Sequence, residues 1–155
     1  MPSRTTFIGA LGLACVAGLT AGAARSNPDE RAIRLHIERY YFEGVRRADT
    51  AAARRAFHPV ATMYFVRDGE FAQRSIPDWL AALAQGAPNP PAPDTVPRRI
   101  VSVDVTGNAA MAKLELAYPE AIVTDYLSLL KVNGEWMVVG KVFDRRARTV
   151  PAAGG

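Results

Sequence analysis

The C-terminal third of the chain contains long segments in which apolar and polar residues alternate, the pattern of β-strands. The clearest segment, residues 124–143 (TDYLSLLKVNGEWMVVGKVF), has two apolar runs joined at Asn133-Gly134, a dipeptide typical of hairpin turns. A second pair of runs, residues 99–117, surrounds Gly107-Asn108. The pattern therefore predicts two antiparallel hairpins at the end of the chain.

The hairpin around Gly107-Asn108 is predicted to bury one face. With a two-residue turn, alternation puts Ser102, Asp104 and Lys113 on the solvated face. The apolar face then holds Val101, Val103, Val105, Ala110, Ala112 and Leu114.

The register of the last hairpin can be predicted from its charges. A three-residue loop, residues 132–134, places Lys131 opposite Glu135 and Asp125 opposite Lys141. A two-residue loop breaks both of these pairs. We therefore predict the three-residue loop, because it pairs opposite charges twice.

In that register both faces of the last hairpin are apolar. One face holds Val123, Asp125, Leu127, Leu129, Met137, Val139, Lys141 and Phe143, and the other holds Tyr126, Leu130, Trp136, Val138 and Val142. An antiparallel sheet with one solvated face alternates more cleanly. We therefore expect one face to line the interior and the other to form a homodimer through the sheet.

The N-terminal half carries helix signals. Asn27-Pro28-Asp29-Glu30 combines an N-cap residue with proline at the first helical position, and residues at helical spacing follow it. Asp49 or Thr50 is predicted to begin a short second helix that ends at Ala56. The residues predicted to face the core from the first helix are Ile33, Ile37, Tyr40, Tyr41 and Gly44.

His58-Pro59 ends the helical region, because a residue before proline favours extended geometry. Residues 60–67 are then predicted as a strand that turns at Asp68-Gly69. Ser75-Ile76-Pro77-Asp78 is a capping box that begins a helix ending at Gly86. Residues 87–97 contain five prolines and are predicted to form a stiff surface connection or the rim of a pocket.

Residues 1–24 have the order of a secretory signal peptide, with a cation at Arg4, an apolar run and then small residues. The apolar run is short for a membrane-spanning helix, so we expect cleavage and a periplasmic or secreted protein without membrane attachment. Acylation at Cys15 is the alternative. A single domain over residues 25–147 and a flexible C-terminal tail, 148–155, complete the expected organisation.

The charge pattern excludes some classes of partner. The net charge of +4 is mild, and the cations form dispersed arginine pairs such as Arg46-Arg47 and Arg98-Arg99, which indicates solvated surface and no nucleic-acid partner. His36 and His58 are the only histidines and do not form a metal-binding motif. We therefore expect neither a metal nor a cofactor.

Asp125 is the leading candidate for chemistry, because a carboxylate within an apolar strand is either paired or poised as a general base. Lys141 opposes the rise of its pKa, and a structural ion pair between the two is the other interpretation. His58 is a second acid/base candidate, or else a residue that binds a neighbouring carbonyl group. Tyr41, Tyr64 and Trp79 are candidates for lining a ligand pocket, or for ordinary core.

Three segments carry a resemblance to a known family: YYFEGVRRAD at residues 40–49, AFHPVA at 56–61, and the last hairpin. The chain resembles the nuclear transport factor 2-like superfamily, and within it the putative lumazine-binding branch. This resemblance implies an α+β fold in which a curved antiparallel sheet wraps around N-terminal helices into a cone, a cystatin-like roll. It also implies an apolar pocket at the open end and dimerisation through the sheet.

Members of the superfamily differ in chemistry, so the fold alone leaves the reaction open. The first hypothesis is a domain that binds a small apolar or aromatic molecule through Tyr41, Tyr64, Trp79 and Lys141. The alternative is a cofactor-independent isomerase, dehydratase or hydrolase with Asp125 or His58 as general acid/base. A third hypothesis is a purely structural protein whose pocket is filled by its own side chains.

Overall fold

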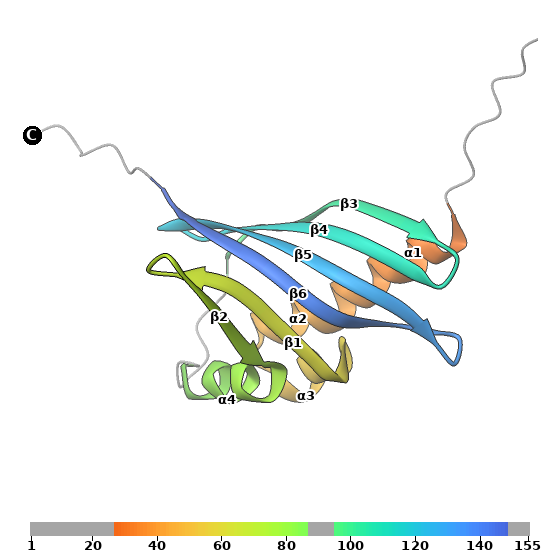
Figure 1. Cartoon of the computed structure of the whole chain (residues 1–155), viewed down its shortest axis with the longest axis horizontal. Coiled ribbons are helices and arrows are strands. Elements are labelled where there is room, and N and C mark those ends of the chain that lie inside the picture. The colour runs from red at the N-terminus through yellow and green to blue at the C-terminus, as the bar shows by residue number, and fades with distance from the viewer. Residues whose placement is uncertain (1–26, 87–94, 149–155) are drawn as a thin grey trace, which may run out of the picture.

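A six-stranded curved sheet with the helices on its concave side forms the domain (Figure 1). The computed structural model describes residues 27–86 and 95–148, so the predictions for the leader, Cys15, most of the proline-rich segment and nearly all of the C-terminal tail lie outside the described residues. The strand order is β2-β1-β6-β5-β4-β3. The strands are β1 (Phe57–Arg67), β2 (Glu70–Ser75), β3 (Arg98–Thr106), β4 (Ala109–Ala117), β5 (Ala121–Val132) and β6 (Glu135–Ala147).

The helical part begins where the capping signal predicts. The Asn27 side chain accepts a hydrogen bond from the Asp29 backbone N–H, and the helix α1 (Pro28–His36) continues without interruption through a π-helical segment, η1 (Ile37–Phe42), into α2 (Glu43–Arg46). The π-helical segment contains two consecutive buried aromatic residues, Tyr41 and Phe42, which belong to the core.

A close helix contact follows. Asp49 caps α3 (Thr50–Arg55) by accepting from the Ala52 N–H, which confirms the predicted short helix. Gly44 lies so near this helix that a Cβ atom built on it would be 2.5 Å from the backbone nitrogen of Ala53. The chain therefore uses glycine here for close approach.

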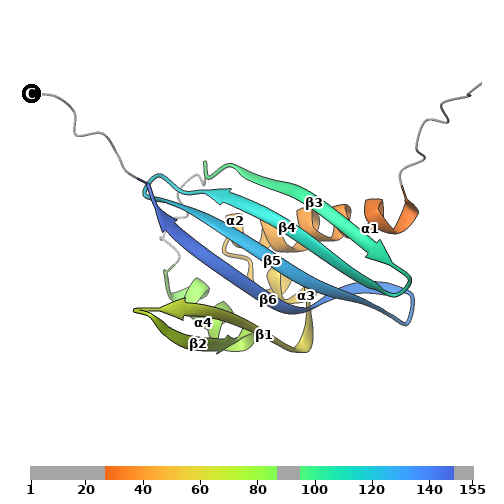
Figure 2. The same ribbon diagram turned by 45° about the horizontal axis from the view of Figure 1, so that its top comes forward.

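The predicted strand, turn and capping box after His58 are confirmed. β1 and β2 are antiparallel and turn at Asp68-Gly69, where both residues have positive φ. Ser75 Oγ accepts a hydrogen bond from the Asp78 N–H at the start of α4 (Ile76–Gly86). In Figure 2, β1, β2 and α4 lie together below the long strands β3 to β6.

The hairpin of β3 and β4 has the predicted two-residue turn, since Thr106 pairs with Ala109. The prediction for Val101 was wrong. A register shift between Ile100 and Ser102 leaves Val101 out of the pairing, and its side chain is 40% exposed, whereas Ile100 takes the inner position opposite Leu114.

The predicted register of the β5–β6 hairpin was also wrong. Val132 pairs with Glu135, so the turn has two residues, and Lys131 lies opposite Trp136. Lys131 does not pair with Glu135 but binds Asp29 of α1 at 2.7 Å, and Asp125 and Lys141 lie opposite Phe143 and Leu127 instead of opposite each other. Tertiary contacts with the helix therefore outweigh cross-strand charge pairing.

A β-bulge at Val139 changes the faces of β6. Leu129 pairs with Val138 and Ser128 with Gly140, so Val139 is the extra residue. Trp136 and Val138 point inward before the bulge, and Lys141 is buried after it. Strict alternation placed Trp136 and Val138 on the face opposite Lys141, which was wrong, because the bulge reverses the alternation.

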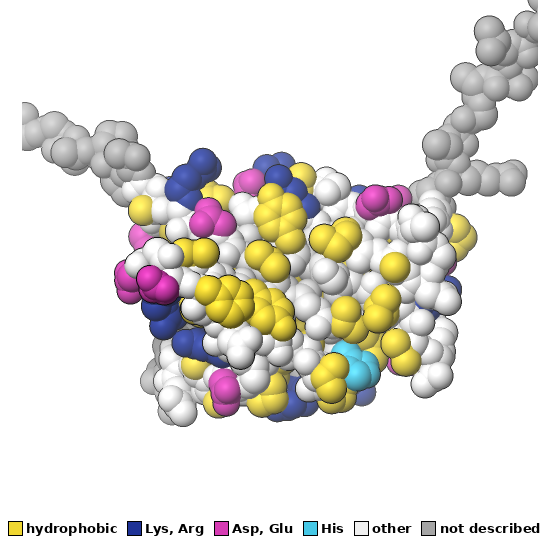
Figure 3. Space-filling model, viewed as in Figure 1, with side chains coloured by type: hydrophobic (Ala, Val, Ile, Leu, Met, Phe, Trp, Pro, Cys, Tyr) yellow, Lys and Arg dark blue, Asp and Glu magenta, His cyan; other side chains and the backbone are white. Residues whose placement is uncertain are grey.

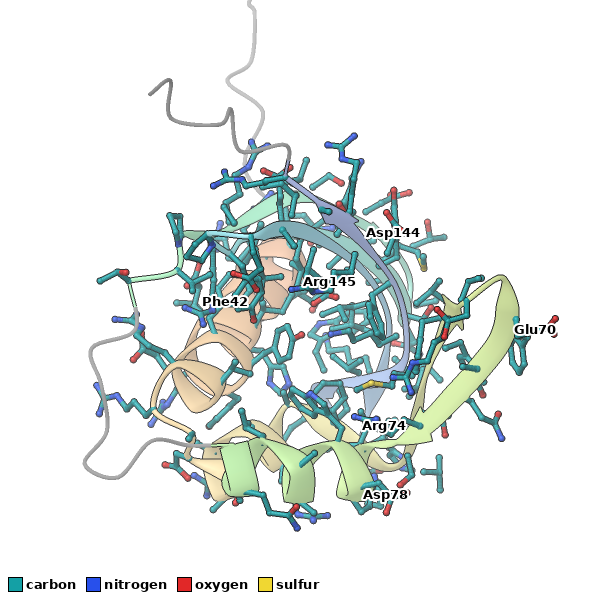
Figure 4. The ribbon with its side chains drawn as sticks, turned by 90° about the vertical axis from the view of Figure 1, so that its left-hand side faces the viewer. Phe42, Glu70, Arg74, Asp78, Asp144 and Arg145 are labelled. Atoms are coloured by element: carbon teal, nitrogen blue, oxygen red, sulfur yellow. The ribbon has the colours of Figure 1, made fainter. Side chains whose placement is uncertain are left out.

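The core fills the concave side of the sheet, and no helix covers the opposite side in the described residues. Viewed from one end, the sheet curves around the helices, and side chains from both converge in the middle (Figure 4). The outward face carries many apolar side chains, seen in yellow in Figure 3. Its exposed apolar residues include Tyr64, Phe71, Val101, Met111, Tyr126, Leu130 and Val142.

The predicted α+β fold class, a curved sheet packed on N-terminal helices, is confirmed. Within residues 27–86 and 95–148, no helix is both long enough and apolar enough to cross a bilayer.

Candidate functional site

Three buried polar side chains meet in the interior. Tyr41 Oη donates to Asp125 Oδ2 at 2.6 Å, Lys141 Nζ donates to Tyr41 Oη at 2.6 Å, and Lys141 Nζ lies 2.9 Å from Asp125 Oδ1. Asp125 is fully buried, and Tyr41 and Lys141 are 2% and 6% exposed. We call these three residues the triad.

Each member reaches the triad through a local feature of the chain. Tyr41 comes from the π-helical segment, and Asp125 occupies an inward position in the middle of β5. Lys141 follows the β6 bulge, so the extra residue Val139 sets the face from which its side chain leaves the strand.

Aromatic rings surround the ammonium group of Lys141. Its Nζ lies 5.0 Å from the ring centroid of Phe143, 5.2 Å from that of Tyr41 and 5.7 Å from that of Trp79. A cation at such distances is attracted to the faces of the rings. Phe57 extends the cluster, since it contacts both Tyr41 and Trp79 edge to face.

The triad holds its protons in a defined arrangement. Burial raises the pKa of Tyr41 well above its usual value, and the negative charge and hydrogen bond of Asp125 raise it further. Tyr41 therefore stays protonated and donates to the carboxylate. An ammonium group has three N–H donors, and the triad offers it only Tyr41 and Asp125, so a donor is left for an outside acceptor.

Two residues near the triad were not singled out from the sequence. The charge of Tyr118 raises the pKa of Tyr41, and that of Arg98 lowers it. Arg98 was assigned to solvated surface as part of an arginine pair, but it is half-buried and donates from Nη1 to the Val96 backbone oxygen at 3.0 Å, whereas its neighbour Arg99 forms an exposed ion pair with Glu115. No local sequence signal distinguishes the two arginines.

The other sequence candidates lie apart from the triad. His58 Nδ1 accepts from the Val60 N–H at 3.4 Å and lines a cavity of about 60 Å³ beside Pro59 and Ile76. Tyr64 is 37% exposed and stacks on Phe71. The structure thus brings together Tyr41, Trp79, Asp125 and Lys141, but not His58 or Tyr64.

Side chains that could bind a metal ion do not cluster in the part of the chain that the structure describes. Among residues 27–86 and 95–148, no group of three or more His, Cys, Asp or Glu side chains is arranged to hold an ion.

The family described as "Putative lumazine-binding" matches residues 28–144. A curated relative, "Aldolase FrzH" of Cladobotryum sp., is 30% identical over 105 residues, which cover 66% of this chain and 81% of the relative.

Two solved structures share the fold. A nuclear transport factor 2-like protein of unknown function from Shewanella baltica OS155 is 28% identical, with a TM-score of 0.68 over 76% of this chain and 94% of that chain. Another from Silicibacter pomeroyi DSS-3 is also 28% identical, with a TM-score of 0.66 over 75% and 94% of the two chains.

Proposed function

We propose that this chain, which belongs to the putative lumazine-binding family of nuclear transport factor 2-like proteins, is a small-molecule-binding domain whose ligand contacts Lys141, Trp79 and Phe143. The observation that carries the proposal is the buried ammonium group, which is enclosed by aromatic rings and retains a donor beyond those used in the triad.

The chemistry of these residues defines the ligand. Trp79 and Phe143 are only partly buried and offer ring faces for an apolar or aromatic molecule. Lys141 supplies a hydrogen bond to a carbonyl or enolate oxygen. Asp125 balances the lysine charge, so a neutral ligand with one strong acceptor suits the site better than a dianion.

Titration with lumazine, an aromatic bicycle with carbonyl acceptors, tests this proposal by isothermal titration calorimetry. We expect saturable binding that weakens at least tenfold in Lys141→Met protein that is still folded. Lys113→Met is the matched control, because Lys113 lies over Tyr126 on the outward face, and it should leave the affinity unchanged. Amide shifts on the wild-type protein should map to the surroundings of Lys141 and Trp79. Binding with shifts only elsewhere would contradict the proposal.

A second candidate function is proton transfer without a cofactor, as in an isomerase, dehydratase, hydrolase or aldolase. The name of the Cladobotryum relative and the triad support this candidate. Asp125 would take a proton from the carbon next to a ketone, Lys141 would hold the enolate oxygen, and the proton would return from Asp125 to carbon. His58 is the alternative base.

Hydrogen–deuterium exchange into phenylacetone, followed by proton NMR in D₂O, tests this candidate. We expect exchange faster than in buffer, lost in Asp125→Asn protein that is still folded and retained in His58→Gln. Exchange at the buffer rate with the folded wild-type protein would exclude this use of Asp125.

The proposal also includes export of the protein and its assembly as a homodimer. The N-terminal pattern supports export to the periplasm or secretion, which N-terminal sequencing of the protein from its native host would test. The apolar outward face of the sheet supports a homodimer, because large exposed apolar surfaces are typical of subunit contacts.

A further inference from the structure

A cavity lies on the outside of the domain, away from the triad. It is a groove of about 530 Å³, within the size range of small-molecule sites, and no triad residue lines it. We call it the α1 groove. Its lining residues are Ala32, Leu35, His36, Arg39, Tyr40, Arg55, Gly134, Glu135, Trp136 and Met137.

The α1 groove has two walls built from regular structure. The helical wall uses positions 32, 35, 36, 39 and 40, the spacing of one helix face, next to the buried stripe that contains Ile33 and Ile37. The turn between β5 and β6 and the start of β6, residues 134–137, form the other wall, and Arg55 enters from the end of α3.

Two guanidinium groups lie over one ring in this groove. Arg39 and Arg55 are 5.5 Å and 5.7 Å from the ring centroid of Tyr40. Neither forms an ion pair within residues 27–86 and 95–148, whereas Arg34, Arg46 and Arg145 each bind a glutamate. Glu135 is the one acidic residue of the lining, so the groove is net positive.

His36 adds a neutral polar group to the groove. Its Nε2 donates to the backbone oxygen of Ala56 at 3.1 Å, and burial lowers its pKa, so the ring is neutral near pH 7. Because Nε2 carries the proton, Nδ1 is an acceptor. Leu35, 70% exposed, and Met137 provide apolar surface beside these groups.

From this combination we propose that the α1 groove is a second ligand site, for a small amphipathic anion with a ring and one carboxylate. Arg39 and Arg55 bind the carboxylate, because guanidinium groups match its two oxygens. The ring packs against Tyr40 and Leu35. The site is independent of the triad, so it stands whether or not the interior ligand is identified.

NMR with the ¹⁵N-labelled full domain tests the proposal. The probe is 2-naphthoate, and its neutral counterpart is 2-naphthalenemethanol, which keeps the ring and removes the charge. A residue-resolved measurement is needed, because the outward face of the sheet is also apolar. The variant is Arg39→Gln with Arg55→Gln. The matched control is Arg54→Gln, since Arg54 adjoins Arg55 but lines the small cavity near His58.

We expect saturable shifts of amides in residues 32–40 and 134–137 with 2-naphthoate, and at least tenfold weaker binding of the alcohol. The double variant should lose at least tenfold in affinity, and Arg54→Gln should match the wild type. Equal binding of acid and alcohol, or shifts confined to the sheet or to the triad, would overturn the proposal. Unchanged affinity in the folded double variant would do the same.

Discussion

Asp125 and Lys141 form a buried ion pair at 2.9 Å although they are not directly opposite each other in the β5–β6 hairpin. Asp125 lies opposite Phe143, and Lys141 lies opposite Leu127, so the two charges are diagonal neighbours on the inner face. A third group, the Tyr41 hydroxyl, contacts both of them. The hydrophobic interior therefore encloses a neutral set of polar groups rather than a lone charge.

Removing one member of the ion pair should destabilise the fold strongly. Asp125→Asn and Lys141→Met each leave a buried charge without its partner, at a cost of about 3–5 kcal/mol in unfolding free energy. The double variant should cost less than the sum of the two, which urea denaturation measures. Lys113→Met, on the outward face, should change stability by less than about 0.5 kcal/mol. If the losses in unfolding free energy of the two single variants add up to that of the double variant, Asp125 and Lys141 are not energetically coupled.

Tyr41→Phe should remove part of the alkaline destabilisation. The folded protein holds the Tyr41 proton because its pKa is raised above the unfolded value of about 10. Above pH 10 the folded state therefore binds more protons, and the unfolding free energy falls as pH rises. We expect a steeper loss between about pH 9.5 and 10.5 in the wild type than in Tyr41→Phe, measured by urea denaturation. The variant itself should cost about 1–3 kcal/mol at pH 8. Equal slopes would argue against this assignment.

Gly44→Ala should test the contact between the first helix and α3. The added methyl group would lie 2.5 Å from Ala53 N and 2.8 Å from its Cα, both backbone atoms that cannot rotate away. We expect a loss of about 1–3 kcal/mol in thermal or urea unfolding. Gly140→Ala is the control, because no atom lies within 4 Å of the position that its added methyl group would take, and it should be neutral or slightly stabilising.

Val142→Lys should disrupt the proposed dimer. Val142 is 54% exposed on the outward face, and a lysine there would place like charges at the subunit contact. Sedimentation should show the wild type as a dimer at micromolar concentration and the variant as a monomer. Leu35→Lys, at an exposed position on α1, should remain dimeric. A monomeric wild type would contradict the dimer.

His36→Gln should reduce the loss of unfolding free energy between pH 7 and pH 5. Burial lowers the folded pKa of His36 below its unfolded value of about 6.5. Between these two values the unfolded state binds more protons, so the stability present above about pH 6.5 is lost as the pH falls. Glutamine can still donate to the Ala56 oxygen but does not titrate. The wild type should therefore lose more stability than the variant between pH 7 and pH 5, and identical profiles would rule this out.

Local signals were sufficient for much of the fold. The caps at Asn27, Asp49 and Ser75 and the turn at Asn133-Gly134 depend on neighbouring residues only, and the structure has each of them. The register of β5 and β6 depends on packing against distant helices. Lys131 binds Asp29, 102 positions away, and Glu135 therefore has no role in the pairing that charge alone predicted.

The candidate site was predictable only in part. Asp125 and Lys141 attract notice as charges within apolar strands, but the hydrogen bond from Tyr41 spans 84 positions and needs the π-helical turn. In the sequence alone, Tyr41 and Trp79 cannot be told apart from ordinary aromatic core residues. The α1 groove was not predicted, because it arises where a helix face meets a hairpin turn that lies far along the chain.

Val139 also affects how relatives of this chain should be compared. If a homologue that lacks this one extra residue were aligned without a gap at Val139, the residue placed under Lys141 would be the counterpart of Val142, whose side chain points to the exterior. Substitutions in the family should therefore be interpreted only after the insertion or deletion at this position has been determined. Otherwise an unrelated surface residue would be mistaken for the counterpart of the interior cation.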